Sequence, residues 1–243
     1  MRQWFEDWFN SDYYHLLYDN RDVNEAAIFL DNLLEHFNPS NNAHFLDLAC
    51  GKGRHARYLA DKDYFVTGLD LSEASIITAS EYENDRLEFF IHDMRNAFRV
   101  NYYDVVLNLF TSFGYFNTDR EHINTLKNVE KGLHPGGLFV LDFLNAKKIS
   151  QSLVPEERLE KYGMHFDIMR AMDDQWIIKE IYIEDGDENY MFREQVRNFN
   201  VDALKSMATE VGLVVTDLFG SYSLDSFAPS ISDRCILICK KPL

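Results

Sequence analysis

Two glycines and three acidic residues in this sequence have the types and the spacing of a nucleotide-binding site. Gly51 and Gly53 follow a short apolar run and precede a segment with helical spacing, which predicts a strand, a tight turn and a helix. Glycine lets the backbone approach a ligand closely, and the free N–H groups at the start of the helix face the turn. Asp47, Asp70 and Asp93 lie at or near the ends of three successive predicted strands, where parallel sheets bind their ligands. We therefore expect all five residues near one pocket.

The glycine pattern fits two kinds of nucleotide. Residues 51–56 match the dinucleotide pattern G-x-G-x-x-A, and Asp70 follows at a suitable spacing to hold ribose hydroxyls. The carboxylate of Asp47 would repel the pyrophosphate of a dinucleotide that lay over this turn. S-adenosylmethionine (SAM) has an ammonium and a sulfonium group there instead, and Asp47 would attract both. The charge favours SAM, and an NAD-dependent oxidoreductase is the alternative.

Alternating strands and helices must position these residues. Apolar runs alternate with helical segments from residue 45 to residue 143, and this order predicts a parallel sheet with helices on both faces. Residues 164–198 have a period of two, which predicts a small antiparallel β-insertion added to the main sheet. The expected strands outside the insertion are 45–49, 64–69, 87–91, 103–109, 138–143, 213–219 and 234–239, and the expected helices are 54–61, 72–82, 120–133 and 201–211. Residues 1–38 are rich in aromatic side chains and are also expected to be helical.

Five motifs between residues 45 and 145 resemble those of class I SAM-dependent methyltransferases, in the same order. Ala49 departs from the glycine that many members have at its position. The architecture of the insertion and of the aromatic N-terminal segment resembles small-molecule methyltransferases related to glycine N-methyltransferase. The five motifs are Asp47-Leu-Ala-Cys-Gly-Lys-Gly for the glycine turn, Gly68-Leu-Asp-Leu-Ser for the ribose-binding acid, Asp93-Met94 for the adenine, Tyr103-Asp-Val-Val-Leu-Asn-Leu for the fourth motif and His134-Pro-Gly-Gly-Leu for the turn into the fifth strand.

The resemblance implies a fold, a cofactor and a set of contacts. The implied fold is α/β, with a doubly wound, mostly parallel seven-stranded sheet and a small antiparallel β-insertion after strand five. The chain divides into an N-terminal helical lid segment (1–40), a SAM-binding Rossmann-like domain (41–147 and 200–243) and the insertion on the substrate side (148–199). His55, at the start of the first helix, is expected at the surface. We expect cofactor contacts from Tyr18, Asp47, Ala49, Gly51, Gly53, Asp70, Leu71, Asp93, Met94 and Asn108, and substrate contacts from Arg21, Ser112 and Tyr115.

Composition limits the partners. The formal net charge of −16 disfavours nucleic acid and anionic lipid, so neither nucleic acid nor a membrane is an expected partner. The three cysteines are too few for a disulfide framework, and Cys235 and Cys239 are expected in the core, with no metal. The sequence has no signal peptide and no apolar run long enough to span a membrane, which favours a cytoplasmic protein. We expect a monomer or a homodimer.

The expected reaction is an in-line transfer of the methyl group from SAM to a nitrogen or oxygen of a small molecule. Most of its acceleration should come from alignment of donor and acceptor, so no catalytic base is assigned. The alternatives are the NAD-dependent oxidoreductase and a SAM-binding module without turnover, because binding and catalysis are separate properties.

Overall fold

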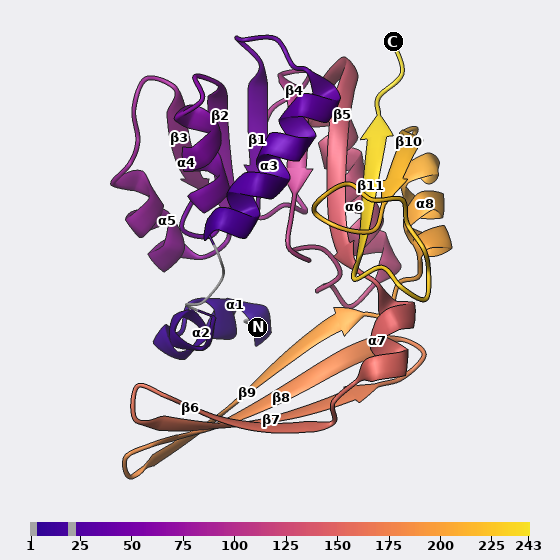
Figure 1. The fold of residues 1–243 in the computed structure, drawn as a ribbon. Coiled ribbons are helices and arrows are strands. Elements are labelled where there is room, and N and C mark those ends of the chain that lie inside the picture. The colour runs from indigo at the N-terminus through magenta and orange to yellow at the C-terminus, as the bar shows by residue number, and fades with distance from the viewer. Residues whose placement is uncertain (1–3, 19–22) are drawn as a thin grey trace.

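A computed structural model describes residues 4–18 and 23–243 of the chain. It has a seven-stranded sheet covered by helices, a separate four-stranded sheet, and two short N-terminal helices between the sheets (Figure 1). Within the described ranges, no helix has the length and apolar character needed to cross a membrane.

The seven-stranded sheet has the strand order β10-β11-β5-β4-β1-β2-β3. The five strands from β1 to β5 are parallel, and β11 is antiparallel to both of its neighbours, β5 and β10. This arrangement confirms the predicted fold, and it brings the carboxyl ends of β1, β2 and β4 to one edge. The strands are β1 (His44–Leu48), β2 (Phe65–Asp70), β3 (Leu87–Ile91), β4 (Tyr103–Asn108), β5 (Leu133–Leu144), β10 (Val214–Phe219) and β11 (Arg234–Lys240).

Helices cover both faces of this sheet with two apolar clusters. One cluster includes Leu126 and Leu204 from α6 and α8, and the other includes Phe29 and Leu59 from α3 and α4. Helix α3 therefore packs on the seven-stranded sheet, although it was predicted as part of the N-terminal segment. Cys235 and Cys239 are buried as free thiols, as predicted. The helices are α3 (Val23–Phe37), α4 (Arg54–Ala60), α5 (Glu73–Ser80), α6 (Asp119–Gly132), α7 (Ala146–Ser152) and α8 (Val201–Glu210).

The predicted antiparallel insertion follows β5 and forms a four-stranded sheet of its own. Its strands are β6 (Glu156–Lys161), β7 (Met164–Met172), β8 (Trp176–Asp185) and β9 (Glu188–Arg197). The period of two predicted β7, β8 and β9 but missed β6, because Glu-Glu-Arg-Leu-Glu-Lys is mostly charged and exposed. Pairing with β7 along its whole length makes it a strand.

The N-terminal helices α1 (Trp4–Phe9) and α2 (Asp12–Leu17) pack on the four-stranded sheet. A third apolar cluster joins Trp8 and Leu17 to Phe166, Ile168 and Ile181 of the insertion. Figure 1 shows both helices between the four-stranded sheet and the ends of the parallel strands. They therefore form one wall of the space above the strand ends.

Candidate active site

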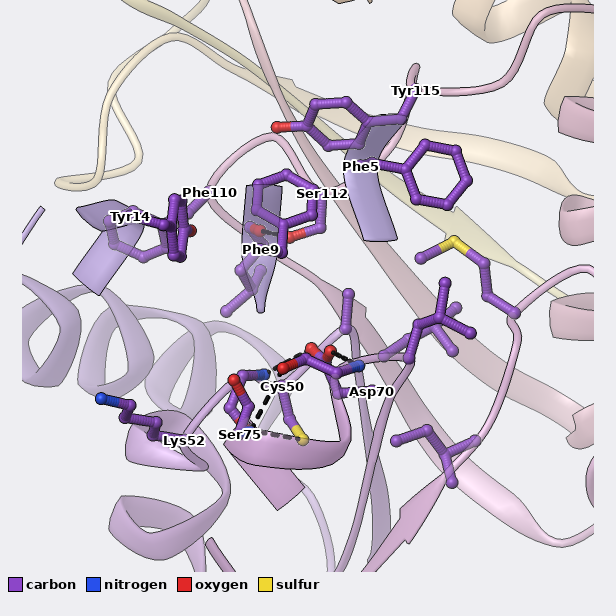
Figure 2. Close-up of a pocket in the computed structure, with 18 of the residues that line it drawn as sticks. Phe5, Phe9, Tyr14, Cys50, Lys52, Asp70, Ser75, Phe110, Ser112 and Tyr115 are labelled. Carbon is purple, nitrogen blue, oxygen red and sulfur yellow. Dashed lines mark hydrogen bonds between the residues drawn. The ribbon is translucent and has the colours of Figure 1, made fainter. Parts of the chain in front are cut away.

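A cavity of about 460 Å³ lies between the N-terminal helices and the carboxyl ends of the parallel strands. Figure 2 shows Asp70 and Cys50 on one side of it, and Phe5, Phe9 and Tyr115 on the other. Nine of the predicted site residues line the cavity, namely Tyr18, Ala49, Gly51, Asp70, Leu71, Asp93, Met94, Ser112 and Tyr115. Asp47, Gly53 and Asn108 do not line it, and Arg21 lies outside the described residues.

The turn after β1 contains three residues with left-handed backbone angles. The φ angles are 65° for Ala49, 55° for Gly51 and 76° for Gly53. Glycine would adopt the left-handed backbone at position 49 more easily than the alanine that is present. A Cβ atom on Gly53 would lie 2.5 Å from the Phe89 ring, whereas a Cβ atom on Gly51 would meet nothing within 4 Å. Gly53 therefore permits close packing of α4, and Gly51 forms the cavity surface.

Asp70 ends β2 and is fixed by two backbone N–H groups. Gly51 donates to its Oδ2 at 2.7 Å, and Ser72 donates to its Oδ1 at 2.8 Å. Burial raises the pKa of Asp70, and these two hydrogen bonds oppose the increase. Ser72 caps α5 by accepting from the backbone N–H of Ser75, and its hydroxyl also donates to Asn10 at 2.7 Å. A rigid carboxylate thus faces the cavity beside the glycine turn.

Asp93 follows β3 and is held by Arg95. The Arg95 guanidinium donates to both Asp93 oxygens, at 3.0 Å from Nε and 2.6 Å from Nη2, and also reaches Glu121 at 2.9 Å. Burial raises the pKa of Asp93, but the hydrogen bonds from Arg95 outweigh it, so the pKa lies below its usual value. Asp93 is therefore an ionised acceptor in the cavity wall, next to Met94.

Two buried acceptor atoms lie close to the strand ends, outside the cavity lining. Asp47 is 1% exposed, and its Oδ2 has no hydrogen-bond partner among the described residues. Burial raises the pKa of Asp47 to about 7, while Arg54 lowers it and Asp70 raises it. Asn108 donates from Nδ2 to the Leu48 carbonyl at 2.9 Å, and its Oδ1 has no described partner. These oxygens make the base of the site attractive to a cation.

His55 is buried, so the predicted surface position is wrong. Its ring stacks on Phe110 at 5.1 Å with an interplanar angle of 22°, and its Nδ1 is 3.9 Å from Asp47 Oδ2. The Arg54 guanidinium lies 4.3 Å from the centre of the Phe110 ring. The first turn of α4 packs against Phe110. This tertiary contact buries His55, which the local sequence pattern places at the surface.

Tyr18 lines the cavity, and its hydroxyl is fixed on the four-stranded sheet. Tyr18 donates to Glu194 Oε1 at 2.7 Å, and Trp8 Nε1 donates to the same oxygen at 2.6 Å. Lys179 contacts Glu194 Oε2 at 3.2 Å. One carboxylate of β9 thus anchors both N-terminal helices, which carry Phe5, Phe9 and Tyr14 into the cavity wall.

The loop after β4 supplies the remaining predicted residues. Tyr115 packs on Trp4 and Phe9, with ring centroids 5.7 and 5.3 Å apart, and Ser112 donates to the Leu109 carbonyl at 2.9 Å. The sequence analysis missed Phe110 and Thr111, which also line the cavity. Both have positive φ angles, 56° and 59°, which no sequence signal predicts for Phe or Thr. The described residues contain no group of His, Cys, Asp or Glu that could hold a metal ion.

Comparison with known proteins relates this geometry to one class. Residues 45–137 match the family described as "Methyltransferase domain". The chain is 34% identical over 109 residues to the putative methyltransferase YqeM of Bacillus subtilis (strain 168), which is 44% of each chain. It is 29% identical over 137 residues to the dTDP-3-amino-3,4,6-trideoxy-alpha-D-glucopyranose N,N-dimethyltransferase of Streptomyces venezuelae, covering 55% of this chain and 56% of that one. Each of these two alignments thus spans about half of the relative.

A solved structure resembles nearly the whole chain. The crystal structure of a SAM-dependent methyltransferase from Clostridium acetobutylicum ATCC 824 matches with a TM-score of 0.78 at 21% identity, over 95% of this chain and 96% of that chain. The strand order of the sheet and the position of the cavity at the strand ends are those of the class I, Rossmann-like methyltransferase fold. Residues 45–137 match a methyltransferase domain, and the rest of the chain shares the fold of the solved SAM-dependent methyltransferase. The predicted cofactor is therefore SAM, and the domain match decides against the NAD-dependent oxidoreductase.

Proposed function

We propose that this chain transfers the methyl group of SAM to a nitrogen atom of a small molecule. The observation that carries the proposal is a single cavity that combines the Asp70–Gly51 turn with a wall of aromatic rings. The N-terminal helices and the four-stranded sheet cover the strand ends, which favours a small acceptor over a macromolecule. We also propose a division of the chain. Residues 1–40 include the helices that cover the cavity, residues 148–199 form the substrate side, and residues 41–147 with 200–243 form the cofactor domain.

The residues present fit SAM. Asp70, Asp93 and Met94 all line the cavity, and we infer that Asp70 binds the ribose hydroxyls and that Asp93 and Met94 contact the adenine. Asp47 Oδ2 and Asn108 Oδ1, which are buried and accept no hydrogen bond from the described residues, give the base of the site the negative character that suits the ammonium and sulfonium groups. Arg54, which lines the cavity, has the charge to hold the carboxylate of the cofactor. When bound, SAM supplies an electrophilic methyl group on a positively charged sulfur.

An amine acceptor fits the groups around the cavity. Among the described lining residues the carboxylates are Asp70 and Asp93, and both accept hydrogen bonds from backbone N–H groups. A hydroxyl acceptor would need a base, whereas a neutral amine attacks without one. Aromatic faces such as those of Phe9 and Tyr115 stabilise the cationic nitrogen of the product. The Streptomyces relative, which is named as an N,N-dimethyltransferase, supports the choice of nitrogen.

The chain's own contribution to the reaction is alignment and exclusion of water. Tyr18 and the aromatic residues of α1 and α2 shield the cavity, which favours a transition state in which charge spreads from sulfur to the acceptor. Ser112 and Tyr115, in the loop after β4, line the same cavity, and we infer that they contact the acceptor and help to align it with the methyl group.

Isothermal titration of SAM, S-adenosylhomocysteine and NAD tests the cofactor site. We expect micromolar binding of the two sulfur ligands and no binding of NAD. Asp70→Ala should raise the Kd of both sulfur ligands by at least tenfold, because the ribose would lose a charged hydrogen-bond partner. Asp85→Ala, an exposed aspartate outside the cavity, is the matched control and should bind as the wild type does. Binding of NAD alone would overturn the assignment.

A matched panel of small amines and alcohols then tests turnover. We expect S-adenosylhomocysteine to accumulate with at least one amine and not with the alcohol of the same skeleton. Tight SAM binding without turnover on any amine of the panel would favour the binding module, and turnover on alcohols alone would contradict the choice of nitrogen.

A further inference from the structure

Asp142 is a fully buried carboxylate near the end of β5, and it does not line the cavity. Its Oδ2 accepts from the backbone N–H of Phe110 at 2.7 Å, and its Oδ1 accepts from Arg234 Nε at 2.7 Å. Its backbone carbonyl accepts from the N–H of Thr111 at 3.1 Å. Tyr222 adds a longer hydrogen bond to Oδ2, at 3.3 Å. The main chain and side chain of Asp142 thus hold two successive residues of the loop after β4.

Arg234 completes the arrangement from β11. Its Nη2 donates to Thr111 Oγ1 at 2.8 Å while its Nε binds Asp142. Burial lowers the pKa of Arg234, but the neighbouring Asp142 outweighs it, so the guanidinium stays charged. A planar guanidinium can bind a carboxylate and a hydroxyl together in fixed directions, which an ammonium cannot.

The loop held in this way has an unfavourable backbone. Phe110 and Thr111 have φ angles of 56° and 59°, in a region that side chains other than glycine rarely adopt, least of all β-branched ones such as Thr. Such a conformation persists only when the surroundings fix it. The bonds from Asp142 and Arg234 are directed at these two residues.

The conformation of the loop determines where Phe110 lies. The Phe110 ring stacks on His55, lies beneath the Arg54 guanidinium, and contacts Tyr222 at 5.0 Å. His55 and Arg54 belong to the start of α4, next to the turn at which SAM is proposed to bind. Asp70, on β2, accepts hydrogen bonds from Gly51 and Ser72, and neither residue belongs to this loop.

We propose that Asp142 and Arg234 are positioning residues for the methionine end of the cofactor. They hold Phe110 and Thr111 in the left-handed conformation, and Phe110 in turn fixes Arg54 and His55 at the cavity surface. The proposal rests on the cofactor site proposed above. Because Asp70 is held independently, loss of the pair should affect the methionine half of the ligand and spare the adenosine half.

Two ligands that differ in one half provide the test. S-adenosylhomocysteine has the amino-acid end, and 5′-methylthioadenosine lacks it while keeping the adenosine. In Asp142→Asn, one oxygen is replaced by a donor, so either Phe110 or Arg234 loses its acceptor. We expect the Kd of S-adenosylhomocysteine to rise about tenfold, the effect of one lost hydrogen bond to a charged group, and that of 5′-methylthioadenosine to change less than about twofold.

Arg234→Lys is the second variant and has a matched control. Lysine keeps the charge but cannot hold Asp142 and Thr111 in the same geometry, so we expect the same selective loss. Arg99 has the equivalent arrangement away from the cavity, where its Nη1 donates to Glu88 at 2.5 Å and to Thr67 Oγ1 at 3.1 Å. Arg99→Lys should therefore leave the affinities of both ligands unchanged.

A rescue experiment separates loop geometry from general stability. Thr111→Gly adopts a positive φ without strain, so in the Asp142→Asn background it should recover at least threefold of the lost S-adenosylhomocysteine affinity. An equal rise in the Kd of both ligands, or no rise in either Asp142→Asn or Arg234→Lys, would overturn the proposal. If the wild type bound neither ligand, the cofactor site itself would be refuted instead.

Discussion

The environment of Asp47 differs from the one predicted from the sequence. Its charge was predicted to attract SAM from within the pocket, but the side chain is buried outside the cavity lining, with one oxygen unpaired among the described groups. Burial of a carboxylate without full compensation disfavours the charged form, so its pKa rises to about 7. The residue therefore lowers the stability of the free protein at neutral pH, which is a cost that a bound cation would offset.

The Asp47→Asn variant tests this cost through its pH dependence. The pKa in the folded state lies above that of the unfolded chain, so the folded state holds the proton more tightly, and the contribution of Asp47 to stability falls as the pH rises from about 4 to 7. Asparagine does not titrate. We expect the free energy of unfolding of the variant, relative to the wild type, to be roughly 2 kcal/mol higher at pH 8 than at pH 5.

Urea denaturation at the two pH values measures this difference. The exposed Asp85→Asn is the control and should show no such change with pH. A difference between Asp47→Asn and the wild type that is the same at pH 5 and pH 8 would mean that Asp47 does not titrate abnormally.

At the scale of elements, Glu194 of β9 connects two units that are distant in the sequence. Trp8 in α1 and Tyr18 at the end of α2 donate to the same Glu194 oxygen, and the side chain is 16% exposed. Hydrogen bonds to a charged acceptor contribute about 1.5–3 kcal/mol each, more than neutral ones. Glu194 therefore adds a polar attachment to the apolar cluster that holds the aromatic cavity wall on the insertion.

Replacement of this carboxylate should release the N-terminal helices. In Glu194→Ala, we expect limited proteolysis before residue 23 to accelerate by at least tenfold, because docking loses on the order of 2 kcal/mol. Cleavage within the seven-stranded sheet should not change. Glu184→Ala, an exposed position on β8, is the matched control. An equal acceleration in both variants would assign no special role to Glu194.

The elements were predictable to different degrees, for physical reasons. Leu87–Ile91 was predicted with its exact bounds, because a short apolar run between turn signals has no competing structure. Strand β6 was missed because its pairing with β7, and not its own composition, makes it a strand. The proximity of Asp70 to the glycine turn was anticipated from the sequence. The backbone of Phe110, on which His55 stacks, is held by Asp142, which is remote in sequence. Local pattern cannot contain that information.

At the scale of the whole molecule, the net charge of −16 acts on the ligand before contact. SAM has one positive charge more than S-adenosylhomocysteine, because the sulfur of the product is neutral. A strongly negative protein attracts a cation over about a Debye length, and salt screens this attraction. We therefore expect the charge to favour capture of the substrate form of the cofactor over the product form.

Stopped-flow fluorescence at two ionic strengths measures this effect. The association rate constant of SAM should fall several-fold between about 20 mM and 500 mM salt, and that of S-adenosylhomocysteine should remain nearly constant. The product is the control ligand, since it shares every group except the methyl and its charge. Equal salt dependence of the two ligands would contradict a role of the net charge in binding.

The bond between Trp8 and Glu194 joins residues that are 186 positions apart in the chain. During synthesis, α1 and α2 emerge before the parallel strands, and the strand to which they dock emerges after those strands. The parallel strands β1 to β4 can pair much earlier, since they lie between residues 44 and 108. The nascent protein therefore passes through a stage in which the strand ends have formed and the aromatic wall has no support. We therefore expect closure of the cavity to follow the synthesis of β9, after the parallel strands have been made.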